Sequence, residues 1–341
     1  YGSGWSTEVM SNENNMTPAQ FASAIQQHLG FTAYTILDNP NQLGIQHIDC
    51  NAKLVDAETV LVKQLPHNNP EYACLEDLAA AFAAATTYYG RNFEVKRIYC
   101  PEIDGPYWET NPSAAYTNSL VLNNKVYVPQ YGIPEDAGAL QSYQDALPGY
   151  EVIGFLYANW YGEDALHCRT MGIFDPQMNH ISHAKLRTGD VSPDTVTPVN
   201  ITIMDYSQTG IVNASVVLQW RYDGATEWQS VTFTPDPDSN RDRTVQTFSA
   251  QMPALDAGST VNYRILAENQ AGKVGAHPAA GWHVFQLECL NSGDVDGSGV
   301  LTAGDAQLAF QITLGLIMPT SVQLCAADCN GSGDVTAGDA Q

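Results

Sequence analysis

The sequence predicts three successive parts: an α+β part over residues 1–187, an all-β part over residues 188–287 and a short repeat over residues 291–341. In the first part, helix signals and hairpin signals follow each other without a regular strand–helix alternation, which is typical of α+β architecture. In the second part, short alternating strands are separated by turns, the pattern of a β-sandwich. In the third part, one acidic, glycine-containing motif occurs twice.

Local signals predict the elements of the first part. Thr17 is a natural N-cap with Pro18 at the first helical position, and Gly30 is a helix terminator, so residues 18–29 form a helix. The residues before Thr17 lack such signals and are predicted to be a loop. Similar reasoning predicts helices over residues 72–89 and 136–147, strands over residues 31–37, 52–55, 59–63, 93–99 and 150–156, and a hairpin over residues 119–129 that turns at Asn123 and Asn124.

The second part follows a linker rich in threonine, proline and aspartate at residues 188–198. Turn dipeptides separate its strands, and this spacing over about 100 residues predicts an immunoglobulin- or fibronectin-like sandwich. Trp220 and Tyr263 lie in two of the strands and are expected in its core rather than at a ligand site. The predicted strands are residues 199–204, 215–222, 229–234, 244–250, 260–268 and 282–287.

The third part carries the spacing of a calcium loop at residues 294–305 and again at residues 328–339. Oxygen-bearing side chains stand at loop positions 1, 3, 5, 9 and 12, and glycine stands at position 6, where the chain must turn sharply. The last ligand is aspartate where EF-hands use glutamate. An acidic turn repeat without metal is the alternative. The expected Ca²⁺ ligands are Asp294, Asp296, Ser298, Val300, Thr302, Asp305, Asp328, Asn330, Ser332, Asp334, Thr336 and Asp339.

Composition bounds the partners. The net charge of −23 argues against a nucleic-acid partner and favours cations, because nucleic-acid binding needs a basic surface. Hydrophobic residues make up 44% of the chain, enough for sizeable cores. No apolar run is long enough to span a membrane. Because the chain starts at Tyr1 and stops at Gln341 inside the second calcium-type motif, we expect both ends to be cut.

The cysteine count is odd, at 7, so one thiol is expected to stay unpaired, although the pairing of the others cannot be deduced. Cys168 is the candidate reactive thiol, because it follows His167 and an aromatic loop, and positive charge lowers a thiol pKa. His180 and His183 could face each other on a helix, but no third ligand is visible. The other free thiols of the first part are expected to be buried: Cys50, Cys74 and Cys100.

A second polar cluster lies at His47 and Asp49. In a segment of β character these side chains share one face, while Ile48 and Cys50 point the other way. Opposite a thiol, the carboxylate can hold a cationic substrate and the imidazole can shuttle a proton. A structural His–Asp hydrogen bond is the alternative. By the same alternation, His167 is expected to point away from the pocket.

Five segments carry a family resemblance in this order: QHIDC (46–50), LEDLAAAF (75–82), YTNSLVLNNKVYVP (116–129), PGYEVIG (148–154) and ALHCRT (165–170). Together they resemble the bacterial, Porphyromonas-type peptidylarginine deiminases and the related agmatine deiminases of the guanidino-group-modifying superfamily. The likeness covers residues 1–187 and extends into the Ig-like part. The terminal repeat resembles a dockerin domain, which implies Ca²⁺-stabilised folding and a cohesin-type partner.

The resemblance implies a five-bladed α/β propeller, the pentein fold, whose first part is missing from this chain. It assigns Cys168 as the nucleophile, His47 as the general acid/base, Asp49 as a carboxylate that binds the guanidinium group, and Asn118 as a polar residue of the active site. The implied reaction is hydrolytic, passes through a covalent thiouronium intermediate on Cys168, and needs no cofactor.

We therefore expect a secreted or surface-attached enzyme that converts peptidyl arginine to peptidyl citrulline, with agmatine deiminase as the alternative. The family's second guanidinium-binding aspartate lies upstream of Tyr1, so the chain is expected to be inactive alone. A non-catalytic surface scaffold with a degenerate deiminase domain is the alternative from another class. Absence of the upstream aspartate segment from the complete gene would favour the scaffold.

Overall fold

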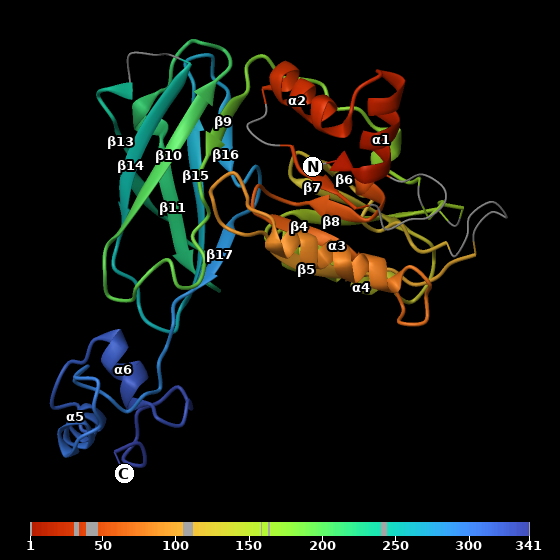
Figure 1. Ribbon diagram of the computed structural model, residues 1–341. Coiled ribbons are helices and arrows are strands. Elements are labelled where there is room, and N and C mark those ends of the chain that lie inside the picture. Colours follow the sequence, from red (N-terminus) through yellow and green to blue (C-terminus); the bar gives the residue numbers. More distant parts are fainter. Residues whose placement is uncertain are drawn as a thin grey trace. The chain divides into compact units, whose positions relative to one another are not determined.

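The computed structural model divides into two compact units, Tyr1–Phe174 and Asp175–Gln341, whose elements are labelled in Figure 1. The sequence placed this boundary at residue 187, which is wrong: strand β9 (Asn179–Ser182) pairs with β10 (Thr197–Asp205) and belongs to the second unit. No helix in the described part is long and apolar enough to cross a membrane. The structure describes residues 2–30, 34–38, 47–104, 112–157, 159–162, 164–239 and 244–340.

The first unit begins with two helices. Helix α2 (Pro18–Leu29) has the predicted bounds, with a capping box between Thr17 and Gln20 and with Gly30 at φ 72°. Helix α1 (Gly4–Glu13) lies where a loop was predicted. It was not predicted because its sequence contains neither a helix cap nor an apolar stripe. Of the strand predicted over residues 31–37, only β2 (Ile36–Leu37) is found, paired in parallel with β1 (Gly2–Ser3); residues 31–33 lie outside the described residues.

The rest of this unit contains the same ββαβ arrangement twice. An antiparallel hairpin is followed by a helix and then by a strand that joins the hairpin in parallel. The elements are β3 (Ala52–Leu54), β4 (Thr59–Gln64), α3 (Tyr72–Ala84) and β5 (Glu94–Tyr99), then β6 (Leu120–Leu122), β7 (Lys125–Gln130), α4 (Asp136–Ala146) and β8 (Glu151–Leu156).

The α+β prediction is confirmed, and a repeated unit is what a propeller requires, although five blades remain a prediction. Helix α3 ends earlier than residue 89. Thr86 forms a β-bridge with Asn92, and the Thr87 N–H donates to the Arg91 carbonyl at 2.8 Å, so this segment turns back instead of continuing the helix. The hairpin turn at Asn123 is as predicted, with φ 55°.

The core of the first unit holds the segment that leads to the candidate site. Tyr116 is fully buried, and its hydroxyl donates to Asp136 Oδ1 at 2.7 Å. The Tyr143 hydroxyl donates to the Tyr116 carbonyl at 2.9 Å. Asp136 and Tyr143 both belong to α4, so the packing of this helix fixes the position of Tyr116 and of the residues that follow it.

The second unit contains two antiparallel sheets around one core, as the β-sandwich prediction requires. Trp220 is 5% exposed and Tyr263 is fully buried, which confirms their predicted core positions. Strands β9 and β16 escaped prediction because they are short and lack apolar alternation. The strands of the first sheet lie in the order β13 (Thr234–Pro235), β14 (Val245–Met252), β10 and β9. Those of the second sheet lie in the order β12 (Gln229–Thr232), β11 (Val217–Tyr222), β15 (Thr260–Glu268) and β16 (Val274–His277). Strand β17 (His283–Gln286) also pairs with β15.

A cluster of histidines lies within this sandwich. His283 Nε2 lies 2.9 Å from His277 Nδ1, and His183 Nε2 lies 3.1 Å from the Tyr263 hydroxyl. His180 lies in β9 and His183 directly follows this strand, so neither is on a helix; His183 is buried and His180 is exposed. Burial lowers the pKa of His283 well below its ordinary value, and the charges of His277, His183 and Lys185 act in the same direction.

This cluster predicts acid sensitivity of the second unit. Below pH 6.5, His283 of the unfolded chain takes up a proton that the folded chain does not, so the free energy of unfolding should fall by about 1.4 kcal/mol per pH unit. Urea unfolding between pH 7 and 5 at constant Ca²⁺ measures the slope. His283→Gln should flatten it, and an unchanged slope in that variant would contradict this origin.

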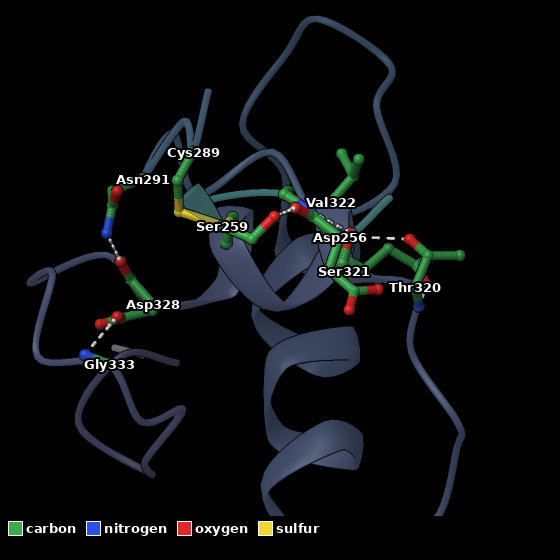
Figure 2. Close-up of a disulfide and its surroundings, with 12 residues drawn as sticks. Asp256, Ser259, Cys289, Asn291, Thr320, Ser321, Val322, Asp328 and Gly333 are labelled. Carbon is green, nitrogen blue, oxygen red and sulfur yellow. Dashed lines mark hydrogen bonds between the residues drawn. A yellow bond between two sulfur atoms is a disulfide. The ribbon is translucent and has the colours of Figure 1, made fainter. Parts of the chain in front are cut away.

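The terminal module of the second unit is small and cross-linked. Its helices are α5 (Ala303–Thr313) and α6 (Ser321–Ala327), and a disulfide joins Cys289 to Cys325 (Figure 2). Asp194 from the linker accepts hydrogen bonds from Ser321 Oγ at 3.0 Å and Val322 N at 3.2 Å, at the start of α6. With a sequence separation of 36, the disulfide removes about 4 kcal/mol of chain entropy from the unfolded state.

Candidate active site

Three segments far apart in sequence meet in the first unit. Asp49 lies in a 3₁₀ turn, Ile48–Cys50, that precedes β3, and Asn118 lies in the turn that precedes β6. Cys168 lies in a second 3₁₀ turn, His167–Arg169, beyond β8. Asp49 and Asn118 therefore hold comparable positions, each before the first strand of a ββαβ unit. Cys168 contacts both side chains.

Asn118 is the centre of this site. It is fully buried, and its Oδ1 accepts hydrogen bonds from the main-chain N–H groups of Ala165, His167 and Cys168 at 3.1, 3.0 and 3.2 Å. Its Nδ2 donates to Asp49 Oδ2 at 3.0 Å and to Cys168 Sγ at 3.1 Å. One amide thus folds the cysteine turn and orients both reactive side chains.

Asp49 contacts His167 rather than pairing with His47. Its Oδ2 lies 2.7 Å from His167 Nδ1 and 3.5 Å from Cys168 Sγ. Burial would raise the pKa of Asp49, but the hydrogen bond and charge of His167 outweigh it, so this pKa is lowered. The expectation that His167 points away is wrong, because strand alternation does not apply in a 3₁₀ turn, which repeats every three residues.

His47 stands just before the first 3₁₀ turn, as its N-cap, with an exposed side chain. The segment is not a strand, so the expected shared face of His47 and Asp49 is not the arrangement found. His47 is nevertheless close enough that its charge helps to lower the pKa of Asp49. Its role as acid/base remains a prediction.

Cys168 is exposed and held among hydrogen-bonding groups. A hydrogen bond from the Cys50 thiol, with help from the Asn118 amide, outweighs burial and the charge of Asp49 and holds the pKa of Cys168 below its ordinary value. A lowered thiol pKa increases the thiolate fraction at neutral pH, as a nucleophile needs. Cys50 and Cys100 are buried as predicted, whereas Cys74 is half-buried.

Lys53 also belongs to this region, although reasoning from the sequence missed it. Its side chain is 9% exposed, and Nζ donates to the Ser119 carbonyl at 2.6 Å, next to Asn118. Burial lowers the pKa of Lys53 to about 8, against the opposing charges of Asp49 and Cys168. Its position three residues after Cys50 was the available signal, but a lysine in a strand is normally exposed.

In the first acidic loop of the terminal module, three carboxylates lie close together. One oxygen each from Asp294, Asp296 and Asp305 lies within 4.8 Å of the others. Asp294 accepts the N–H groups of Ser298 and Gly299 at 3.0 and 2.7 Å, which wraps the loop around its first residue. Calcium prefers oxygen ligands at this kind of turn, so the residues fit that ion.

The second loop has the same internal bonds. Asp328 accepts the N–H groups of Ser332 and Gly333 at 2.9 and 2.7 Å, as Asp294 accepts those of Ser298 and Gly299 in the first loop. Figure 2 shows the bond between Gly333 and Asp328. Asp339 Oδ1 is buried and makes no hydrogen bond within the described residues. A buried carboxylate oxygen without a donor at loop position 12 is suited to a cation.

The model of the Porphyromonas-type peptidyl-arginine deiminase family matches residues 6–173. Curated proteins that carry the name agmatine deiminase, from Lactococcus lactis and Enterococcus faecalis, are each 28% identical over 142 residues. Each match covers 36% of this chain and 39% of the relative. The chain therefore spans about two fifths of the length of the curated relatives it matches.

Solved structures with similar parts carry related names. One named as a peptidyl-arginine deiminase is 20% identical, with 48% of this chain and 50% of that chain covered and a TM-score of 0.43. The agmatine deiminase of Enterococcus faecalis is 24% identical, with 42% and 46% covered and a TM-score of 0.37. Residues 6–173 are thus similar to the Porphyromonas-type peptidyl-arginine deiminase family, and part of the chain is similar to the two curated proteins named as agmatine deiminases.

Proposed function

We propose that the first unit is part of an enzyme that hydrolyses a guanidino group, with Cys168 as its nucleophile. The observation that carries this proposal is the convergence of Cys168, Asp49 and Asn118, in which one amide binds both the carboxylate and the thiol. A carboxylate 3.5 Å from a thiol can hold a guanidinium carbon next to the sulfur.

In the proposed reaction, the Cys168 thiolate attacks the guanidinium carbon and a covalent tetrahedral adduct forms. Ammonia leaves with a proton from an imidazole, which leaves a thiouronium group on Cys168. The same imidazole then takes a proton from water, and the water oxygen displaces the thiolate to release the ureido product. Asp49 stabilises the positive charge of the reacting group throughout. No metal or organic cofactor takes part in this scheme.

His47 is our proposed acid/base, and the contact of His167 with Asp49 makes His167 the rival. In the complete gene product, His47→Asn should lower kcat by about 100-fold or more, because general acid–base catalysis contributes 10²–10⁴-fold. His167→Asn should act through Asp49 and mainly raise KM. The reverse pattern, measured with the same substrate, would assign the proton transfer to His167.

Peptidyl arginine is the proposed substrate class, in line with the name of the matching family, and agmatine is the second candidate, because the curated relatives carry that name. Citrulline formation from an arginine peptide and carbamoylputrescine formation from agmatine separate the two. Cys168→Ser in the complete gene product should abolish turnover, while Cys74→Ser, a half-buried thiol on α3, should not. Retained turnover in Cys168→Ser would show that Cys168 is not the nucleophile.

The chain alone offers a test of the site that needs no turnover. The cation chloroacetamidine should alkylate Cys168 faster than neutral chloroacetamide, because Asp49 attracts a positive charge. Asp49→Asn should reduce this preference by about tenfold, since about 1.4 kcal/mol of attraction is lost between groups this close. An unchanged ratio of the two alkylation rates would show that Asp49 does not bind the guanidinium group and would favour the non-catalytic scaffold.

We propose further that the second unit consists of an Ig-like sandwich and a dockerin-like module that binds Ca²⁺ and docks to a cohesin-type partner. The repeated acidic loops support calcium binding, as described above. The Cys289–Cys325 disulfide supports a secreted or surface location, because disulfides persist in oxidising compartments.

A further inference from the structure

A second thiol lies inside the candidate active site and forms no bond to substrate in the proposed reaction. Cys50 is fully buried, follows Asp49 in the same 3₁₀ turn, and hydrogen-bonds to Cys168. Thr117 Oγ1 donates to the Cys50 carbonyl at 2.8 Å, and the adjacent Asn118 binds the Cys168 N–H and Sγ. Two neighbouring residues of one segment therefore hold the two cysteines against each other.

We propose that Cys50 and Cys168 form a redox pair, in which a peroxide oxidises Cys168 and Cys50 then closes a reversible disulfide. The disulfide would block the nucleophile and protect it from irreversible oxidation. Its formation stands on the contact of the two thiols alone, whereas its effect on turnover rests on the proposed function.

The chemistry has two balanced steps. The Cys168 thiolate attacks one peroxide oxygen, so an S–O bond forms, the O–O bond breaks, and hydroxide leaves; sulfur is oxidised by two electrons and the peroxide is reduced. The Cys50 sulfur then attacks the sulfur of the Cys168 sulfenic acid. An S–S bond forms, the S–O bond breaks, and the Cys50 proton leaves with the hydroxide as water.

The environments of the two thiols set the order of these steps. Cys168 is exposed and has the lowered pKa, so a peroxide reaches and oxidises it first. The hydrogen bond to Cys168, followed by burial, raises the pKa of Cys50, so that thiol stays protonated and out of reach. Conversion of Cys168 to a neutral sulfenic acid removes the first of these causes, and the positive charge of Lys63 favours loss of the Cys50 proton.

Peptide mapping of the peroxide-treated chain tests the pair. Hydrogen peroxide should produce a cross-linked peptide pair containing Cys50 and Cys168, two hydrogen atoms lighter than the thiol forms and fully restored by dithiothreitol. In Cys50→Ser, the same dose should carry Cys168 on to sulfinic acid, so that most of the oxidised Cys168 is no longer recovered by the reductant. Cys100→Ser, which removes another buried thiol of the first unit, should leave the cross-link unchanged.

Oxidation of Cys168 in the wild-type chain without the cross-link would overturn the proposal, and so would equal recovery of Cys168 in wild type and Cys50→Ser. The mapping needs no turnover, so an absence of deiminase activity would count against the proposed function alone. Because the cross-link is read in the wild-type chain, a folding defect in Cys50→Ser would leave the test decisive.

Discussion

Replacing Asn118 with leucine is expected to weaken the first unit by about 2–4 kcal/mol in urea unfolding, because buried main-chain donors lose their acceptor. Leucine has similar volume but no oxygen, so the N–H groups of Ala165 and Cys168 would lack their bonds to Oδ1. The His167 N–H would keep the main-chain carbonyl of residue 118, at 3.1 Å. The matched control is Asn92→Leu, an exposed position in a β-bridge, which loses one exposed side-chain hydrogen bond to the Ala83 carbonyl and should cost about 1 kcal/mol.

Asn118→Asp separates folding from reactivity at the same position. Aspartate keeps an oxygen for the main-chain donors but replaces the NH₂ group that donates to Asp49 and Cys168 with a second acceptor. The Asn118 hydrogen bond is one cause of the lowered pKa of Cys168, and a new carboxylate adds repulsion. The pKa of Cys168 should therefore rise.

The pH dependence of alkylation by iodoacetamide, read at the Cys168 peptide, measures this change. The alkylation rate of the wild-type thiol should level off at a lower pH than the rate of the Asn118→Asp thiol. Coincident profiles, or equal stability of Asn118→Leu and Asn92→Leu, would show that Asn118 does not organise the cysteine turn.

Local rules predicted the elements whose boundaries are set by adjacent residues. Helix α2 follows from Thr17, Pro18 and Gly30, and the β6–β7 hairpin from its asparagine turn. Helix α3 was predicted too long, because the turn that ends it depends on a bridge to Asn92, which helix propensity does not encode. Strand β9 was missed since its pairing with β10 comes from tertiary structure, not from its sequence NHIS.

The candidate site could be predicted only in part. The resemblance selected Asp49, Asn118 and Cys168, and the structure brings these three together across 119 residues of sequence. Reasoning from strand alternation failed at His47 and His167, because both lie at 3₁₀ turns, which no local signal announces. The contributions of Cys50 and Lys53 depend on what packs around them, so neither could be derived from spacing.

Removal of calcium is expected to have the largest effect on the terminal module, whose apolar core is small, with Val295, Ala309, Ile312 and Ala327 as its buried residues. A site saturated at 100 times its Kd adds about 2.7 kcal/mol of stability, so chelation should unfold a module of this size. The protein with intact disulfide should bind two Ca²⁺ ions per chain in a calorimetric titration and should lose helical circular dichroism in EGTA.

The two loops also supply a matched pair of variants. In the loop pattern, Asp328 at position 1 would bind Ca²⁺ through its carboxylate, whereas Asp334 at position 7 would bind it through its main-chain carbonyl. Asp328→Asn should lower affinity at one site by at least about tenfold, or 1.4 kcal/mol, while the same change of charge in Asp334→Asn should leave affinity within a factor of about two. Equal losses of affinity in the two variants would mean that the loop attracts cations only through its overall charge. No Ca²⁺ binding by the unaltered protein would show that this module is not a calcium site.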